Sequence, residues 1–291
     1  MMASVSSVGG VFDVTNSSGT GAFVLVCEHA SNAIPPQFDN LGLTPDVLQT
    51  HVAWDPGAHA VAAAMSAKLD CPLIAPRVSR LVYDCNRARD AQSAVPDRSE
   101  SYEIPGNKGL SDADRQARAD QYYTPFRDAL ATLIDQRTAE IQAPVIITVH
   151  SFAPVYDGEK RDLELGIIHD SDARFADSFL AAAQADATFG VRRNEPYAPK
   201  DGVTHTLTEH ALPRGLLNVM IEIRNDLITM PTGQHAVAEY LCTCAAKAVA
   251  EASNDPNVAN GSCPATEPAP ICSPVRHKDN TPSGPVVVGT R

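Results

Sequence analysis

The sequence lacks any apolar run close to the roughly 20 residues that a membrane-spanning helix requires. It also lacks a cluster of lysines and arginines that could neutralise a phosphate backbone, and its formal net charge is -12 at pH 7. Its first residues carry neither the basic segment nor the long apolar segment of a secretory signal. We therefore expect a cytoplasmic protein that binds neither membranes nor nucleic acid.

Cysteine pairs with metal-binding spacing are also missing. The seven cysteines are odd in number, and none of them belongs to a C-x-x-C motif. Cys242 and Cys244 lie two residues apart, but a zinc knuckle would need a second pair, for which Cys263 and Cys272 are weak candidates. Most of the cysteines have apolar neighbours, which predicts reduced core thiols rather than a disulfide framework.

The composition of the chain changes near residue 253. Residues 253–291 are rich in proline, serine, asparagine and glycine and contain no aromatic residue. Such a segment cannot bury enough apolar surface to offset the entropy lost on ordering, so we expect a disordered tail. Residues 10–252 are predicted to form a single domain.

Short apolar runs alternate with helical patterns in residues 10–252. The predicted strands are Ala22–Cys27, Leu73–Ala75, Leu81–Asp84, Val145–Val149, Leu163–Ile168 and Asn218–Ile223. The predicted helices are Gly57–Leu69, Leu110–Gln142, Ser171–Ala187 and Thr232–Ala252, with Ser111 as an N-cap and Pro231 at the start of the last helix. This alternation predicts an α/β fold with three layers, α/β/α, around a mixed, largely parallel sheet.

Polar residues that follow predicted strands are the first candidates for a site, because ligands of open α/β sheets bind beyond the carboxyl ends of the strands. Glu222 lies within the last predicted strand, and Asp55 precedes the first long helix. Within three residues of the ends of three other strands lie His29, the pair Asn86 and Arg87, and His150.

These residue types suit metal-assisted hydrolysis of an amide bond. Two imidazoles and a carboxylate leave one position open on zinc, where a water molecule ionises near neutral pH. A separate carboxylate can take the proton of the water and pass it to the leaving nitrogen. Guanidinium groups can stabilise the oxyanion and hold a substrate carboxylate. Mixed nitrogen and oxygen sites also accept iron, manganese or cobalt.

The metal ligands have simpler structural interpretations when each is taken alone. A single histidine after a strand is more often a hydrogen-bonded loop residue than a ligand. Asp55 could cap the helix that follows it. Glu28 is an alternative to Asp55 as the carboxylate ligand, although it points to the face opposite its neighbour His29 if both lie on an extended strand.

The other candidates also have alternatives. Glu222 could be the buried partner of Arg224 or of another arginine, and the pair Asn86-Arg87 alone is more often structural. Among the remaining histidines, His205 lies in a loop with glycine and aspartate that could close over a pocket. The joint occurrence of the candidates at four predicted strand ends favours the functional interpretation.

Several segments resemble the N-formylglutamate amidohydrolase family. They are VLVCEHASNAIP, AWDPGA, SRLVYDCNR, ITVHSF, ELGIIHD, YAPKDGVTHTL and NVMIEIRNDL, and the resemblance spans roughly residues 22–245. The family is related in fold to zinc carboxypeptidases and aspartoacylase-like deacylases. The segment His150-Ser151-Phe152 resembles the carboxypeptidase His-Ser-Tyr at the second histidine ligand. The strand with Glu222 resembles the one that presents the catalytic glutamate.

The resemblance implies a role for each candidate residue. His29, Asp55 and His150 would hold one zinc ion per chain, although Asn32 stands where a carboxypeptidase-like His-x-x-Glu motif has its glutamate. Glu222 and Arg80 would be catalytic. The implied substrate-binding residues are Asn86, Arg87, Arg224 and Ser151.

The implied activity is zinc-dependent hydrolysis of a small N-acyl amino acid, foremost N-formyl-L-glutamate to formate and L-glutamate. Two alternatives stay open at this point. The chain could be another N-acyl-amino-acid deacylase or a carboxypeptidase-like hydrolase with the same zinc site. It could also be a non-catalytic metal-binding or ligand-binding protein on the same fold.

Overall fold

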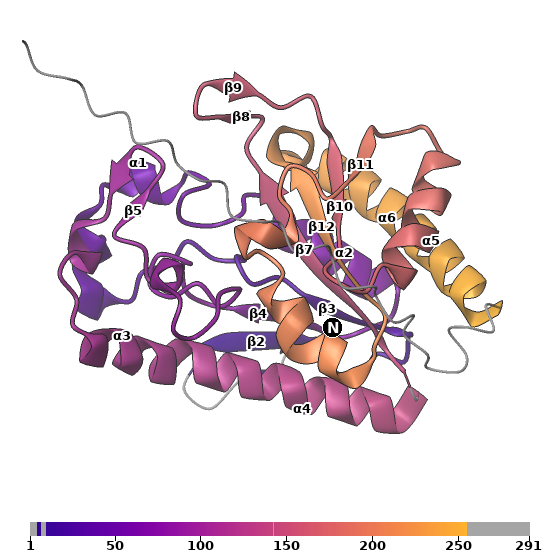
Figure 1. The fold of residues 1–291 in the computed structure, drawn as a ribbon, viewed down its shortest axis with the longest axis horizontal. Helices are drawn as coiled ribbons and strands as arrows, with labels where there is room; N and C mark the ends of the chain where they lie inside the picture. The colour runs from indigo at the N-terminus through magenta and orange to yellow at the C-terminus, as the bar shows by residue number, and fades with distance from the viewer. Residues whose placement is uncertain (1–4, 7–9, 142, 255–291) are drawn as a thin grey trace, which may run out of the picture.

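A single eight-stranded sheet forms the centre of the computed structural model, which describes residues 5–6, 10–141 and 143–254 (Figure 1). The strand order is β1-β2-β4-β3-β7-β12-β10-β11. The strands of this sheet are β1 (Val5–Ser6), β2 (Phe12–Thr15), β3 (Phe23–Val26), β4 (Leu73–Pro76), β7 (Val145–Phe152), β10 (Leu165–Ile168), β11 (Val191–Arg193) and β12 (Asn218–Arg224).

The sheet is mixed and largely parallel, which confirms the prediction. The central strands β4, β3, β7 and β12 run parallel to one another. On one side β2 pairs antiparallel with β4, and on the other side β10 pairs antiparallel with β12. The carboxyl ends of the four central strands therefore meet at one edge of the sheet.

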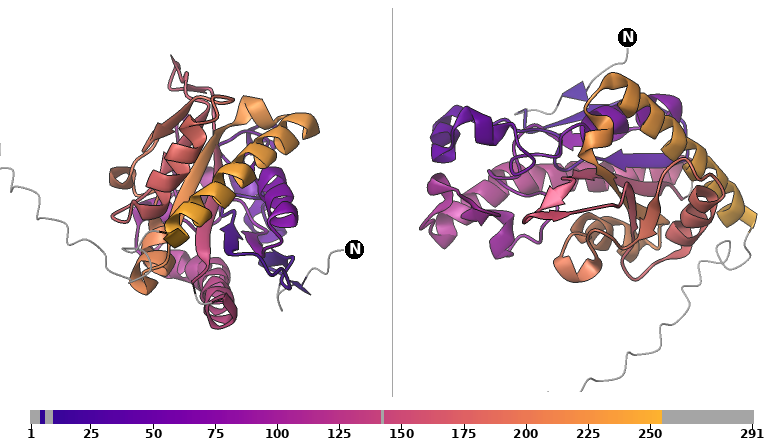
Figure 2. Two further views of the ribbon diagram at one scale, coloured as in Figure 1. Left: turned by 90° about the vertical axis from the view of Figure 1, so that its right-hand side faces the viewer. Right: turned by 90° about the horizontal axis from the view of Figure 1, so that it is seen from above.

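Helices cover both faces of this sheet. Figures 1 and 2 show α4 on the side opposite α5 and α6. The apolar residues of the strands alternate between two cores: Leu25 and Ile147 pack on the side of α2, α5 and α6, whereas Val24 and Ile146 pack on the side of α4. The helices are α2 (Ala58–Lys68), α3 (Asp112–Arg118), α4 (Thr124–Ile141), α5 (Arg174–Gln184) and α6 (Pro231–Asn254). The predicted three-layer α/β/α architecture is confirmed.

Short elements lie in the connections between these layers. Two hairpins, β5 (Arg98–Ser99) with β6 (Tyr102–Glu103) and β8 (Val155–Tyr156) with β9 (Glu159–Lys160), form separate two-stranded sheets. The other short elements are the helix α1 (Pro45–Leu48) and the 3-10 or π-helical turns Pro36–Gly42, Gln92–Ala94, Pro105–Asn107, Ala119–Tyr123, Pro199–Asp201, Leu207–Ala211, Leu212–Arg214 and Asn225–Ile228.

The predicted strand Leu81–Asp84 is wrong. The structure forms turns there, with the N–H of Val82 donating to the carbonyl of Ser79 at 2.9 Å and the Ser79 hydroxyl accepting from the N–H of Leu81 at 3.1 Å. The segment is apolar because its side chains fill the core beside α4, not because it belongs to the sheet.

The predicted helices all occur, with small differences. The region predicted as Leu110–Gln142 is helical from Asp112 to Ile141, interrupted by a π-helical turn at Ala119–Tyr123. Ser111 is the N-cap, as predicted, and it forms a reciprocal capping box with Asp114.

The outer strands of the large sheet, β1 and β2 on one side and β11 on the other, were not predicted from the sequence pattern, nor were the strands of the two hairpins. β2 is half-buried along its whole length, and β11 is mostly exposed, so neither has a continuous apolar run. At the other end of the chain, α6 extends to Asn254, two residues past its predicted end at Ala252. The rest of the predicted tail, residues 255–291, lies outside the described residues.

No helix in the described part of the chain is both long and apolar enough to cross a membrane. The five cysteines within that part are buried and unpaired: Cys27, Cys71, Cys85, Cys242 and Cys244. Cys263 and Cys272 lie outside it.

Candidate metal centre and active-site cleft

A cleft of about 180 Å³ lies at the edge of the sheet where the central strands end. Its walls combine groups from β7 and β12 with loop residues that follow β3 and β4. The residues that line it are His29, His51, Val52, Asp55, Arg80, Asn86, Arg87, Ser99, Glu100, His150, Ser151, Phe152, Tyr156, Tyr197, Val203, Met220 and Glu222. All but one of the predicted site residues are among them.

The sheet register brings His150 and Glu222 together. They are direct partners in the parallel pairing of β7 with β12, so their side chains leave the same face of the sheet. This is the face on which Ile146, four residues before His150, and Met220, two residues before Glu222, pack into the core beside α4. The pairing of β7 with β12 therefore places the imidazole of His150 next to the carboxylate of Glu222.

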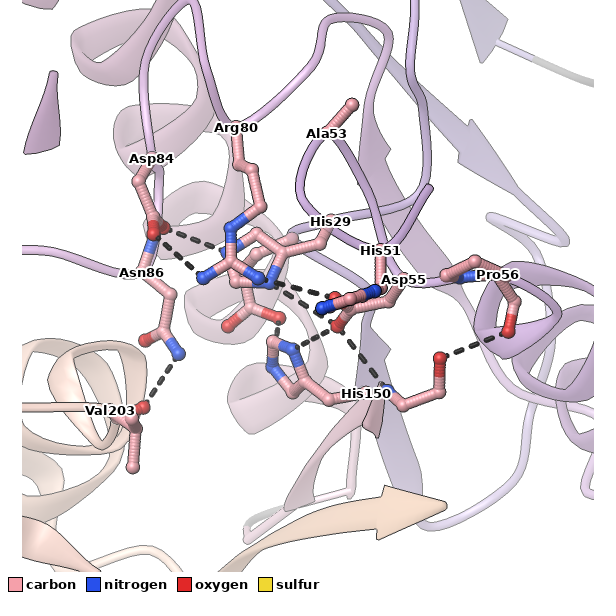
Figure 3. Close-up of polar contacts among 12 residues, drawn as sticks. His29, His51, Ala53, Asp55, Pro56, Arg80, Asp84, Asn86, His150 and Val203 are labelled. Carbon is pink, nitrogen blue, oxygen red and sulfur yellow. Dashed lines mark hydrogen bonds and ion pairs between the residues drawn. The ribbon is translucent and has the colours of Figure 1, made fainter. Parts of the chain in front are cut away.

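Three buried side chains converge within this cleft. One nitrogen or oxygen from each of His29, Asp55 and His150 lies within 4.8 Å of the others. The Nδ1 atoms of His29 and His150 lie 3.2 Å and 2.9 Å from the same Asp55 oxygen, Oδ2 (Figure 3). These separations are close to the roughly 3.3 Å edge of a tetrahedron with metal–ligand bonds of about 2.0 Å. The group can hold a metal ion.

Two further carboxylates lie against the outer nitrogens of the histidines. Asp84 Oδ1 is 2.8 Å from His29 Nε2, and Glu28 Oε2 is 3.1 Å from His150 Nε2. The contact with Asp84 is a hydrogen bond, and the contact with Glu28 is an ion pair. A carboxylate at the far nitrogen helps to orient a histidine that binds a metal through its other nitrogen. Both imidazoles are thus oriented with Nδ1 toward Asp55.

The charges of the cleft favour a cation at this point. Four acidic residues are almost fully buried: Glu28, Asp55, Asp84 and Glu222 are 1%, 3%, 3% and 4% exposed. Arg80 is the one arginine that forms an ion pair with any of them among the described residues, so further positive charges are needed to balance the group. Protonated histidines would supply these charges, and a divalent metal ion on neutral imidazoles would supply them equally well.

The pKa values reflect the same charges. Burial alone would raise the pKa of Asp55, but the two adjacent histidines lower it below its usual range. Burial likewise acts to lower the pKa of His150, but Glu28 and Asp55 raise it well above the ordinary value. The carboxylates therefore favour positive charge at the point where the ligand atoms meet.

A tight turn positions Asp55. Its carboxylate does not cap α2, because that helix has no side-chain cap and begins after Gly57 at φ +82°. A side chain at Gly57 would meet the carbonyl oxygen of Ile228 at 2.6 Å, so only glycine fits. The structure thus directs the Asp55 carboxylate to the two histidines, while the alternative ligand Glu28 lies against the outer nitrogen of His150.

Arg80 lies between two of the buried carboxylates. Its guanidinium nitrogens are 3.3 Å from Asp55 Oδ1 and 3.3 Å from Asp84 Oδ2 (Figure 3). Burial acts to lower the pKa of Arg80, but Asp84 and Asp55 raise it, so the side chain keeps its charge. Arg80 therefore presents a fixed positive charge on the cleft wall.

Glu222 lies in the same cleft with a less stabilised charge. Burial raises its pKa to about 7, with Asp55 adding to the rise and His150 opposing it. One of its oxygens, Oε2, has no hydrogen-bond partner among the described residues. A carboxyl with a pKa near neutrality can both accept and return a proton under ordinary conditions.

Asn86 and Arg87 join the cleft to the loop at residues 201–206. The Asn86 side chain donates to the Val203 carbonyl at 2.6 Å and accepts from the N–H of Thr206 at 3.0 Å. Arg87 donates to the Gly202 carbonyl at 3.0 Å. Both residues thus hold a loop, and their predicted contacts with a substrate stay predictions.

The remaining predicted residues differ in position. Ser151 lines the cleft, but its hydroxyl donates to the Pro56 carbonyl at 2.9 Å. Arg224 is not among the lining residues, because its guanidinium donates to Asp226 at 2.8 Å and to backbone carbonyls of residues 161–163. Its predicted role in substrate binding also stays a prediction.

Sequence patterns did not single out Asp84, Tyr197 or the pair His51 and Glu100. Asp84 ends a segment that was predicted to be a strand, and its carboxylate contact with His29 depends on the turn that forms instead. His51 and Glu100 form an ion pair of 2.5 Å on the cleft wall between loops 49 residues apart. For Asp84 and Tyr197 the sequence held one signal: both lie in segments that resemble the N-formylglutamate amidohydrolase family.

Comparisons with known proteins identify the family of the chain and solved structures with a similar fold. The family model described as N-formylglutamate amidohydrolase matches residues 21–229. A gene product of Agrobacterium tumefaciens of known crystal structure is 51% identical, with a TM-score of 0.82 over 84% of this chain and 96% of that one. The crystal structure of N-formylglutamate amidohydrolase from Ralstonia eutropha is 18% identical, with a TM-score of 0.57 over 84% of this chain and 98% of that one. No curated protein matches the chain.

Proposed function

The chain belongs to the N-formylglutamate amidohydrolase family, and on this premise we propose that it hydrolyses the amide bond of a small N-acyl amino acid. The proposed substrate is N-formyl-L-glutamate, which would give formate and L-glutamate. The observation that carries the proposal is the buried Glu222 carboxylate in one cleft with the convergent His29, Asp55 and His150.

His29, Asp55 and His150 would hold one zinc ion per chain. When bound, the metal ion supplies Lewis-acid polarisation of the amide carbonyl. Three protein ligands would leave a position open for substrate or water, as in catalytic rather than structural zinc sites. Asp84 and Glu28 orient His29 and His150, respectively, through contacts with their Nε2 atoms.

The side chains of the cleft supply the rest of the chemistry. Glu222 removes a proton from the attacking water and returns it to the leaving nitrogen, for which its raised pKa is suited. Arg80 stabilises the negative charge that develops on the carbonyl oxygen. Arg87 binds a carboxylate of the substrate, and Asn86 holds Arg87 and the loop at residues 201–206 in place.

The proposal predicts that purified protein releases formate and glutamate in equal amounts from N-formyl-L-glutamate. Both products can be quantified with coupled dehydrogenases, and N-acetyl-L-glutamate serves as a second acyl substrate. Turnover of another N-acyl amino acid with N-formyl-L-glutamate inert would contradict the assigned substrate. Absence of turnover with all of them, in protein that holds its metal, would contradict hydrolysis itself.

The two outer carboxylates provide a separate prediction. Glu28→Gln and Asp84→Asn should each weaken zinc binding by about 10- to 100-fold, since a histidine ligand loses the group that orients it. Competition with a chromophoric chelator measures this affinity without any substrate. Glu239→Gln and Asp135→Asn are matched controls, because both carboxylates are on the surface. Equal affinity in all four variants would contradict the orienting role.

A further inference from the structure

Guanidinium groups at the cleft differ in whether a carboxylate already neutralises them. Arg80 contacts two carboxylates, Asp55 and Asp84. Arg87 donates only to backbone carbonyls, and Arg161, at the base of the β8–β9 hairpin, has no ion pair among the described residues. Both guanidinium groups are therefore without a direct ion pair among the described residues and can contact an anion, although the charge of Arg87 also lowers the pKa of Asp84.

Aromatic rings hold Arg161 at the rim of the cleft. Its guanidinium carbon lies 4.4 Å from the ring centre of Tyr156, 5.1 Å from that of Tyr197 and 5.6 Å from that of Phe152. All three rings belong to residues that line the cleft. Cation–π contacts of this kind place a positive charge without neutralising it.

The hydroxyl of Tyr197 links this charge to the cleft. Arg161 donates to the Tyr197 oxygen at 3.2 Å, so the hydroxyl hydrogen is left for another acceptor. No described residue accepts it. Burial and the nearby Glu222 raise the pKa of Tyr197, which keeps the phenol protonated and able to donate.

Gly166 allows this arrangement. It is the register partner of Glu222 on β10, and a side chain there would meet the carbonyl oxygen of Glu195 at 1.9 Å. The backbone two residues before Tyr197 therefore passes directly over Gly166 on β10, next to the side chain of Glu222 on the neighbouring strand β12. Tyr197 thus lines the same cleft as the proposed base and contacts Arg161.

We propose that Arg161 and Tyr197 form an anion subsite that binds the side-chain carboxylate of the substrate. With Arg87 on the other carboxylate, the cleft would select N-acyl derivatives of acidic amino acids. This inference rests on the proposed function and adds the residues that determine specificity. Guanidinium and phenol together offer charge-assisted hydrogen bonds that an uncharged amide cannot match.

The test compares Arg161→Gln with wild type on N-formyl-L-glutamate and on the near-isosteric, uncharged N-formyl-L-glutamine. We expect kcat/KM for the glutamate substrate to fall by about 10- to 100-fold, mainly through KM, and that for the glutamine substrate to change less than about threefold. Tyr197→Phe should shift the preference in the same direction by a smaller factor. Arg161→Lys should restore part of it.

Arg192→Gln is the matched control, because this arginine is on the surface, pairs with Glu195 and does not line the cleft. It should leave both substrates unchanged. A purely structural role for Arg161, in which it only holds the β8–β9 hairpin, predicts equal losses on both substrates in Arg161→Gln. That result would overturn the subsite.

Ligand binding separates this inference from the proposed reaction. Calorimetry of L-glutamate and L-glutamine with the zinc-loaded full-length protein should show a preference for glutamate of at least about tenfold, which Arg161→Gln abolishes. If that preference is present but no N-acyl amino acid is hydrolysed, only the proposed reaction fails. If wild type shows no preference in either binding or turnover, the subsite is wrong.

Discussion

Replacing Glu222 with glutamine is expected to lower kcat for N-formyl-L-glutamate by about 10²- to 10⁴-fold while the protein keeps its metal. The amide has nearly the same shape as the carboxylate but cannot accept the proton of the attacking water. Glu222 lines the cleft but does not belong to the group of convergent ligand atoms. Steady-state kinetics and elemental analysis of the same preparation measure the two effects together.

The pH profile supplies a second signature of Glu222. The carboxyl must be ionised to act as a base, so kcat/KM should fall about tenfold per pH unit below the pKa. Without metal this pKa is about 7, and a bound cation would move the fall to lower pH. The residual activity of Glu222→Gln should lack this fall.

Glu239→Gln is the control for Glu222→Gln, because it makes the same chemical change on the exposed surface of α6 and should leave kcat unchanged. Loss of metal from Glu222→Gln would show that the residue is a ligand or a structural group. Retention of kcat would show that another group transfers the proton.

Replacing His150 with alanine is expected to reduce bound zinc from about one ion per chain to nearly none, and to abolish turnover. The side chain is 1% exposed, so no other group can move in from solvent to replace the missing nitrogen. His29→Ala should have the same result. Measuring metal by mass spectrometry after dialysis, with thermal unfolding to confirm the fold, tests both variants.

His235→Ala removes an exposed imidazole on α6 and is the control for these two variants. Asp55→Asn should lose metal as the histidine variants do, whereas Glu28→Gln should retain it with weaker affinity. The reverse order would make Glu28 the third ligand. Full zinc content in His150→Ala would contradict the assigned site.

Strand ends made much of the site predictable from the sequence. His29, His150 and Glu222 follow or lie within almost continuously apolar runs, and buried parallel strands have this pattern. Because the carboxyl ends of such strands meet at one edge, the three residues could be placed together before any register was known.

Contacts that depend on loops could not be predicted in the same way. Leu81–Asp84 has the apolar pattern of a strand but forms a buried turn. Both kinds of segment need apolar side chains, so the pattern cannot distinguish them. The carboxylate of Asp84 reaches His29 only through that turn. Arg161 acquires its position from rings on β7, on the β8–β9 hairpin and in the Tyr197 loop, and no spacing in the sequence records this arrangement.

Removal and return of the metal test the central claim most directly. Dialysis against a chelator should abolish release of formate from N-formyl-L-glutamate, and a titration with zinc should restore it with an end point at one ion per chain. Undiminished formate release from protein shown by elemental analysis to contain no metal would contradict the account.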